Sequence, residues 1–338
     1  APRGGPMTAP LLRVAVVGAT GALGGELLDQ LRERRFPLQE LRPIATDQSL
    51  GATVDWLGHE LPVETEPGSL RGLDLLFLCT PPDASLEWIR RALQAEIPCI
   101  DFSGALAGRE EVLPLVADRL SDAAPAAAPL LAIPAPATLA LTRVLDAIDA
   151  AAGVSRVSAT LCEAASGAGR AGVDALQSET IALFNQEELP ETGLAHTLAF
   201  DCLPADGPLD ADGASGLEAR IAGELRRLLP EGVPSAITAL RVPTFAGMGI
   251  HLALETARPL TPEACREQLG KTDGVSFWAL DPAGPTTRDA IGEDDVLVGR
   301  IRPDPGAANG LLLWLALDPA RLAAGNALRI AEARFRGG

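Results

Sequence analysis

The chain has 338 residues and a formal net charge of −17, and 47% of its residues are hydrophobic and 22% charged. This length suits two domains of ordinary size, and the composition is that of a globular protein. The acidic balance argues against binding to nucleic acid or to an anionic membrane, both of which need basic residues, and no apolar run approaches the ~20 residues of a membrane span.

The five cysteines give neither a disulfide framework nor metal-ligand spacing, since even Cys79 and Cys99 are far apart in the sequence. We therefore expect a cytoplasmic protein without a metal site.

The N-terminal part alternates between continuous apolar runs and segments with apolar residues at helical spacing. Continuous apolar runs predict buried parallel strands, and the helical spacing predicts the connections between them. The predicted strands are residues 11–17, 41–45, 73–79 and 97–102, and the predicted helices are 22–35 and 84–95. This alternation predicts an α/β fold with a doubly wound sheet.

A short strand over 129–132 is predicted to run into a helix that begins near Pro136. Proline fits the first turn of a helix, where its missing N–H costs nothing. From Val154 onward, the pattern predicts strands at 154–162, 235–244 and 249–255 and helices at 171–186, 217–229 and 319–335.

Five segments in a fixed order carry a family resemblance. They are VAVVGATGALG at 14–24, EAASGAGRAG at 163–172, LRVPTFAG at 240–247, DVLVGRIRP at 295–303 and NGLLLWLAL at 309–317. With them the chain resembles aspartate-semialdehyde dehydrogenases, a family of amino-acid biosynthesis, along nearly its full length, and in particular the Usg homologues.

The resemblance implies a Rossmann-like dinucleotide-binding domain and an α+β dimerisation domain like that of glyceraldehyde-3-phosphate dehydrogenase. The first domain is expected to span residues 8–133 and 319–338, and the second residues 134–318. The resemblance also implies a homodimer.

A nicotinamide dinucleotide is the cofactor that the resemblance implies. The glycine turn at 18–24 follows a predicted strand and opens a helix, where backbone N–H groups can receive a pyrophosphate. The alternative is a tight turn that serves only the fold. The expected cofactor-binding residues are Gly18, Thr20, Gly21, Ala22, Leu23, Thr46, Gln48, Ser49, Thr80, Ser166 and Gly167.

The segment after the second strand bears on the choice between NAD and NADP. Gln48 stands where the family commonly has an arginine for the 2′-phosphate of NADP, and Asp47 would repel such a phosphate. We expect NAD to bind at least as readily as NADP.

The residues at the reaction centre depart from the family pattern. The family reaction uses a cysteine thiolate, which adds to the aldehyde, and a histidine, which moves protons. The matching positions hold Pro136 and Met248. Neither side chain can replace the lost group, so we expect no phosphorylating semialdehyde oxidation.

The charged residues of the same centre are partly retained. The resemblance implies that Arg241 holds a substrate carboxylate and that Arg220 replaces a phosphate-binding lysine, whereas Ala107 replaces a phosphate-binding arginine. Glu163 stands where the family has glutamine and is a candidate acid. Arg241 is equally compatible with an ion pair to Glu163.

Three further residues could in principle replace the missing cysteine or histidine of the reaction centre. Cys162 and Cys79 are predicted to be small buried core thiols rather than nucleophiles. His251 follows Met248 by three residues in a predicted strand, so it points to the other face and is predicted to be an exposed surface histidine.

Three functions remain open from the sequence. The first is a dinucleotide-binding homologue without the family reaction, with a small carboxylate as a possible ligand. The second is an oxidoreductase that transfers hydride directly to a small carboxylated carbonyl or imine, with Glu163 as the acid. The third is a non-enzymatic dimer that serves structure or binds a partner.

Overall fold

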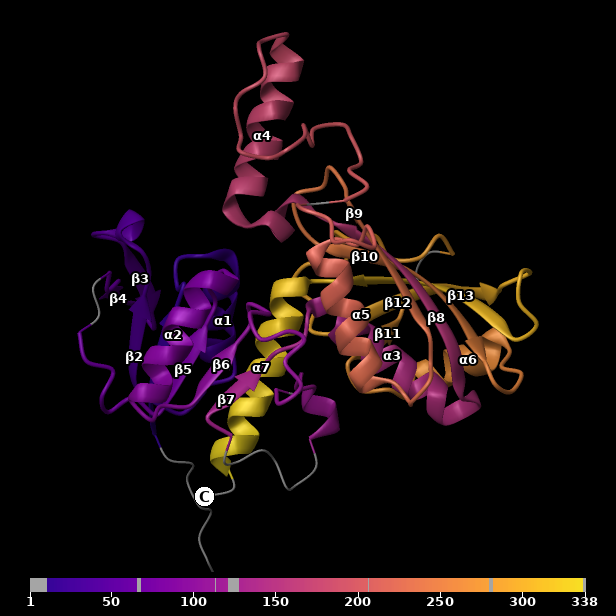
Figure 1. The fold of residues 1–338 in the computed structure, drawn as a ribbon, viewed down its shortest axis with the longest axis horizontal. Helices are drawn as coiled ribbons and strands as arrows, with labels where there is room; N and C mark the ends of the chain where they lie inside the picture. The colour runs from indigo at the N-terminus through magenta and orange to yellow at the C-terminus, as the bar shows by residue number, and fades with distance from the viewer. Residues whose placement is uncertain are drawn as a thin grey trace, which may run out of the picture. The chain divides into compact units, whose positions relative to one another are not determined.

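The computed structural model describes residues 11–65, 68–112, 114–120, 128–205, 207–279 and 282–336. The chain divides into two compact units, of which unit 1 contains residues 1–134 and 323–338 and unit 2 contains residues 135–322 (Figure 1). Residues 8–10 and 337–338, which the sequence analysis assigned to the first domain, lie outside the described residues.

Unit 1 is built on a parallel five-stranded sheet in the order β2-β1-β5-β6-β7. Strand β1 is flanked by β2, the next strand of this sheet in the sequence, on one side and by β5 on the other. The strand order therefore reverses at β1, and the carboxyl ends of β1 and β5 flank a topological switch point. The strands are β1 (Leu12–Val17), β2 (Leu38–Ile44), β5 (Leu75–Leu78), β6 (Cys99–Asp101) and β7 (Leu130–Ala132), and the helices are α1 (Ala22–Glu33), α2 (Pro82–Gln94) and most of α7 (Pro319–Arg336).

Burial explains why these short strands form the centre of unit 1. All four residues of β5 are buried, and from Val14 onward so is every residue of β1. On α1, Leu27, Leu28 and Leu31 are buried at helical spacing and form its inner face.

Unit 2 contains a mixed six-stranded sheet in the order β11-β12-β13-β10-β8-β9. Its strands are β8 (Val154–Glu163), β9 (Ser235–Arg241), β10 (Met248–Thr256), β11 (Val275–Phe277), β12 (Val296–Pro303) and β13 (Gly310–Leu317). Helices α3 (Pro136–Ala152), α5 (Gly216–Leu228) and α6 (Pro262–Leu269) pack against the sheet (Figure 1).

The two faces of this sheet differ in burial. On β10, Ile250, Leu252 and Leu254 are buried, whereas His251 and Ala253, which point to the opposite face, are half-buried. The pattern is that of a sheet with one face in the core and a second face open to a further partner.

Helix α4 (Gly169–Asn185) follows the short helix η3 (Ala165–Ala168) and projects away from the sheet of unit 2 (Figure 1). Its buried Glu179 accepts hydrogen bonds from the backbone N–H groups of Leu198 (2.8 Å) and Ala199 (3.0 Å). This carboxylate fixes the returning chain to α4, so the projecting element is a defined arm.

The structure confirms the predicted α/β class, with a parallel sheet in unit 1 and a mixed sheet in unit 2. A hairpin of β3 (Thr53–Trp56) and β4 (His59–Pro62), helix α6 and strand β11 were not predicted. Helix α1 ends two residues before its predicted end, because Arg35 has a left-handed backbone with φ of 49°. Among the described residues, no helix combines the length and apolar character needed to cross a membrane.

Candidate functional site

The glycine turn of unit 1 lies where β1 ends and α1 begins. Gly18 has φ of +85°, and a Cβ atom there would lie 2.4 Å from the carbonyl oxygen of Cys79 at the end of β5. A Cβ atom at Gly24 would lie 2.1 Å from the carbonyl oxygen of Gly18. Both positions therefore require glycine, and the first turn of α1 is held directly against the strand ends at the switch point.

The N-terminus of α1 is open to an anion. Gly21 occupies the N-cap position, and no side chain caps the helix and no acidic residue stands in its first turn. The backbone N–H groups of Ala22 and Leu23 thus lie at the positive end of a helix dipole, which is the arrangement that receives a pyrophosphate. The residues present fit a dinucleotide.

The loop after β2 lies beside this turn. The hydroxyl groups of Thr20 and Ser49 are 3.0 Å apart, so they share a hydrogen bond. Thr46, Asp47 and Gln48 are exposed in the same short helical loop. The structure thus brings the loop expected to hold the adenosine ribose to the glycine turn.

A salt bridge lies on β2, which leads into that loop. Arg42 on β2 donates two hydrogen bonds to Glu64, with N–O distances of 2.8 and 2.6 Å. The hydrogen bond from Arg42 holds the pKa of Glu64 below its ordinary value. Thr80, which follows β5, shares a 2.8 Å hydrogen bond with Ser85 in α2 and contacts the Gly18 turn.

The cysteines of unit 1 are not reactive thiols. Burial, with a smaller effect of the Asp101 carboxylate, raises the pKa of Cys79 far above its ordinary value and that of Cys99 to about 12. Both thiols therefore stay protonated at neutral pH. Cys99 is buried, whereas Cys79, which was expected to be a buried core thiol, is half-buried.

In unit 2, strand register aligns three residues of the predicted reaction centre. Glu163 at the end of β8 pairs with Arg241 of β9 on one side and with Met248 of β10 on the other. All three side chains are buried. The sheet thus places a carboxylate between a guanidinium group and a thioether.

Arg241 is engaged by its own surroundings. Its Nη1 donates to the carbonyl oxygen of Ala164 at 2.7 Å, and its Nη2 lies 3.3 Å from Oε2 of Glu163. A Cβ atom at Gly167 would lie 2.6 Å from Nη1 of Arg241, so Gly167 leaves room for the guanidinium group. The ion pair between Arg241 and Glu163, one of the two roles expected for Arg241, is formed in the structure.

A cavity of about 240 Å³ opens beside this ion pair. Glu163 and Arg241 supply its charges, Ser215 supplies a hydroxyl group, and Leu217 forms an apolar wall. Its size suits a small organic molecule, and its paired charges favour a ligand that carries both an acceptor and a donor. Ser166, an expected cofactor-binding residue, lies next to this cavity in unit 2, where its N–H donates to the carbonyl oxygen of Phe245.

A buried carboxylate from α5, which was not predicted, lies at the N-terminus of α3. Pro136 is the first residue of α3. Oε2 of Glu224, from α5, accepts hydrogen bonds from the backbone N–H of Ala135 (2.9 Å) and the hydroxyl group of Thr138 (2.5 Å). Oε1 of Glu224 accepts from Nε of Arg220 at 2.8 Å.

These contacts mean that the positive end of α3 and the Arg220 guanidinium group both serve one buried carboxylate. The spacing of Arg220 and Glu224 on one helix face was the only available sequence signal, and it indicates an ordinary i, i+4 pair.

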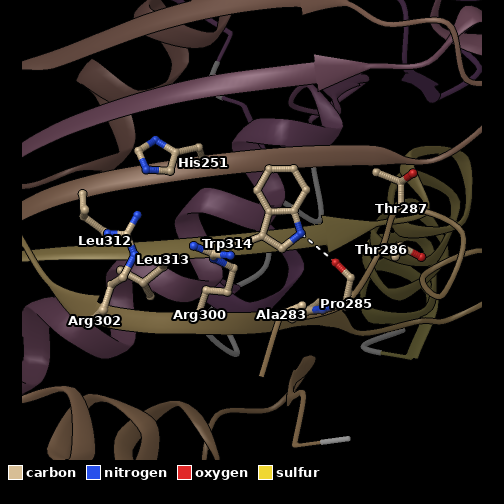
Figure 2. Close-up of a pocket in the computed structure, with 11 residues that line it drawn as sticks. His251, Ala283, Pro285, Thr286, Thr287, Arg300, Arg302, Leu312, Leu313 and Trp314 are labelled. Atoms are coloured by element: carbon tan, nitrogen blue, oxygen red, sulfur yellow. Dashed lines mark hydrogen bonds between the residues drawn. The ribbon is translucent and has the colours of Figure 1, made fainter. Parts of the chain in front are cut away.

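Two further expectations can be compared with the structure. Cys162 is half-buried, and burial raises the pKa of its thiol, with a smaller effect of Cys202. His251 points away from Met248 as expected, but it is half-buried and lines a hollow with Trp314 instead of lying on an open surface (Figure 2). The indole ring opposite His251 on β13 provides this cover.

Within the described ranges, no group of three or more histidine, cysteine, aspartate or glutamate side chains is arranged to hold a metal ion.

Comparison with known proteins gives consistent matches along the chain. The profile for the semialdehyde dehydrogenase NAD binding domain matches residues 13–131, and the semialdehyde dehydrogenase dimerisation domain matches residues 145–321. The aspartate-semialdehyde dehydrogenase of Synechocystis sp. is 32% identical over 95% of this chain and 96% of its own length. The USG-1 protein homolog of Pseudomonas aeruginosa is 33% identical over 95% of this chain and 97% of its own length.

The solved structures agree with this match. The crystal structure of aspartate semialdehyde dehydrogenase II from Vibrio cholerae superimposes with a TM-score of 0.89 at 29% identity, covering 97% of this chain and 99% of that chain.

Proposed function

Because the chain belongs to the semialdehyde dehydrogenase family, we propose that it is a dinucleotide-binding dimer that does not catalyse the family's phosphorylating oxidation of a semialdehyde. The proposal rests mainly on what occupies the N-terminus of α3. Pro136 is its first residue, and the Glu224 carboxylate takes the hydrogen bonds at that end. A thiolate activated by this helix end has no counterpart here.

Met248 supports the same conclusion. It is 5% exposed and lies beside Glu163 in the sheet, where an imidazole would have to exchange protons with the substrate. A thioether has no proton to exchange. With both groups replaced, the covalent route and its acid–base partner are missing together.

The test is a rate measurement with aspartate semialdehyde, phosphate and either NAD or NADP. We expect no phosphate-dependent formation of reduced nicotinamide above the blank at micromolar protein. A control confirms that the dinucleotide binds under the same conditions, so that a missing rate is not a missing cofactor. Turnover that depends on phosphate would refute the proposal.

The dinucleotide is proposed to bind at the Gly18–Leu23 turn of unit 1, with Thr20, Thr46, Gln48, Ser49 and Thr80 beside it. The clashes that exclude a Cβ atom at Gly18 and Gly24 and the uncapped end of α1 support this placement. When bound, the dinucleotide would supply hydride exchange at its nicotinamide ring.

We propose that NAD binds at least as readily as NADP. Asp47 is an exposed carboxylate in the loop beside Thr20, where it can accept a hydrogen bond from a ribose hydroxyl and would repel a 2′-phosphate. Replacing Asp47 with asparagine and Gln48 with arginine should improve NADPH binding at least ~10-fold relative to NADH. A lack of change in this ratio would contradict the assignment.

The cavity beside Arg241 and Glu163 favours a second candidate function, direct hydride transfer to a small carboxylated carbonyl or imine. Arg241 would hold the carboxylate, Glu163 would protonate the reduced centre, and Arg220 would add positive charge nearby. Oxidation of NADH by such a substrate that is abolished in Glu163→Gln but retained in Glu231→Gln, an exposed position outside the cavity, would support it. A third candidate, a dimer without dinucleotide, predicts that neither NADH nor NADPH binds.

The dimerisation domain makes a homodimer the expected assembly. We propose that the open face of the unit 2 sheet takes part in it. Ser158, Thr160 and Cys162 of β8 and Ala253 of β10 are half-buried, small and uncharged, a composition suited to packing against another subunit. A monomeric mass at all concentrations in sedimentation velocity would contradict this.

A further inference from the structure

A basic hollow lies on the second face of the unit 2 sheet (Figure 2). It has a volume of about 570 Å³ and is formed by strands β10, β12 and β13 with the segment 283–287. The name basic hollow is used below for this hollow and refers to five of its lining residues. These are His251, Arg300, Arg302, Leu312 and Trp314.

Glycines and one hydrogen bond shape this hollow. A Cβ atom at Gly249 would lie 2.4 Å from the ring of Trp314, and Gly299 is the residue opposite Trp314 on β12. The indole Nε1 of Trp314 donates to the carbonyl oxygen of Pro285 at 2.7 Å. The indole ring is thus fixed as the apolar floor of the hollow.

The cations of the hollow are available. Among the described residues, the side chains of Arg300 and Arg302 form no hydrogen bond or ion pair, and both are exposed. The side chain of Arg42, by contrast, forms an ion pair with Glu64. Two adjacent guanidinium groups without one mark a site for an anionic partner.

The arm formed by α4 ends in a segment of opposite chemistry. Residues 184–191, with the sequence FNQEELPE, are called the acidic tip, and every one of them is exposed. Phe184 is 75% exposed and Leu189 42% exposed, while Glu188 and Glu191 form no ion pair within the described part of the chain. Phe184 also packs edge-on against the exposed Phe200, with ring centroids 5.7 Å apart.

We propose that the acidic tip of one subunit docks in the basic hollow of a second copy of this chain. Glu188 and Glu191 pair with Arg300 and Arg302, and Phe184 and Leu189 pack on Trp314 and Leu312. The match is one of charge and of apolar content. In a two-fold symmetric dimer this contact forms twice, so the acidic tip of each subunit docks in the basic hollow of the other and no further copy can add to the assembly through it. The inference rests on the proposed homodimer and adds the contact that holds it.

Charge reversal on each side tests the docking. Arg300→Glu with Arg302→Glu reverses the hollow, and Glu188→Arg with Glu191→Arg reverses the tip. Each pair should raise the dimer dissociation constant at least ~10-fold in sedimentation velocity, because like charges then meet across the interface. The protein that carries both reversals should have a dimer dissociation constant within ~3-fold of the wild-type value.

Two controls separate docking from general effects. Glu231→Arg makes the same charge change at an exposed position outside both surfaces and should leave the constant unchanged. Thermal unfolding midpoints confirm that each variant folds. If the variant with Glu188→Arg and Glu191→Arg does not fold, Phe184→Ala takes its place. In a Cys202→Ser background, Glu188→Cys with Arg302→Cys should be joined between subunits by a short bis-maleimide, whereas Glu231→Cys with Arg302→Cys should not.

The outcomes are distinguishable. A wild-type protein that is monomeric at all concentrations refutes the homodimer and this contact with it. A dimer whose dissociation constant is insensitive to both reversals refutes only the docking. Binding of inorganic phosphate in calorimetry that is lost on reversal of the hollow, while the dimer is unaffected, would also overturn the proposal and make the hollow a site for a small anion.

Discussion

At the residue scale, Gly18 is fixed by two separate physical demands. Its φ of +85° is unfavourable for any L side chain, and a Cβ atom would meet a backbone oxygen 2.4 Å away. The Gly18→Ala variant should therefore lose more than ~2 kcal/mol of unfolding free energy and bind NADH at least ~10-fold more weakly.

Gly51 is a matched control for this substitution. It also has a positive φ, +80°, but a Cβ atom there would meet nothing within 4 Å. Gly51→Ala should cost about 1 kcal/mol in chemical denaturation and leave NADH binding unchanged. Equal losses in the two variants would show that backbone strain alone, without close packing at the switch point, explains Gly18.

Glu163 and Arg241 form the ion pair that defines the small cavity of unit 2. Glu163→Gln removes the charge but keeps the side-chain volume, so we expect a loss of about 2–4 kcal/mol in unfolding free energy, because a buried guanidinium group loses its partner. The same variant should bind succinate at least ~3-fold more tightly in calorimetry, since the competing carboxylate is gone. Unchanged or weaker succinate binding would show that Arg241 is only a structural cation.

At the scale of elements, the N-terminus of α3 depends on a residue from another helix. Glu224→Gln should lower the unfolding free energy by about 1–3 kcal/mol, because its carboxylate accepts from both Ala135 and Thr138. Arg226→Gln, at an exposed position of the same helix, should cost less than ~0.5 kcal/mol. Similar losses in both variants would mean that α5 itself, and not the contact with α3, is being destabilised.

The Arg42–Glu64 pair gives unit 1 a dependence on pH. Because folding lowers the pKa of Glu64, its contribution to stability is present above the unfolded-state pKa and is lost as the pH falls through the folded-state pKa. The partly exposed pair should stabilise by about 0.5–1 kcal/mol at pH 7. The difference between wild type and Glu64→Gln should accordingly vanish at acid pH in urea titrations. Glu60→Gln, exposed on β4, should show no such dependence.

The elements with strong local signals were predictable from the sequence. The apolar runs of β1 and β5 and the glycine turn between β1 and α1 fix the Rossmann-like unit, since their patterns are local. The hairpin of β3 and β4 was missed because His59 and Glu60 are polar and the hairpin stands apart from both large sheets.

The site was only partly predictable, for a related reason. The bond between Glu224 and Ala135 joins residues separated by 89 positions, and no sequence periodicity reports such a contact. Strand register places Arg241 and Glu163 side by side, a pairing between distant residues that the sequence alone offered only as one of two alternatives. The half-buried setting of His251 depends on Trp314 of another strand.

At the scale of the whole molecule, unit 1 contains the glycine turn that is proposed to bind a dinucleotide, and unit 2 contains the cavity beside Glu163 and Arg241. A chain with a net charge of −17 repels its own copies at long range, and local charge complementarity would offset this repulsion in a dimer. The contact between the acidic tip and the basic hollow would supply it, and raising the ionic strength should weaken this contact.

Titration calorimetry with NADH and NADPH, each added alone to the wild-type protein, decides whether the glycine turn binds a dinucleotide. We expect micromolar binding of NADH, at least as tight as that of NADPH, and no binding to Gly18→Ala in the same range. An absence of binding for both dinucleotides would refute the proposed cofactor site and leave the glycine turn with a purely structural role. Tighter binding of NADPH would overturn the role assigned to Asp47 and Gln48.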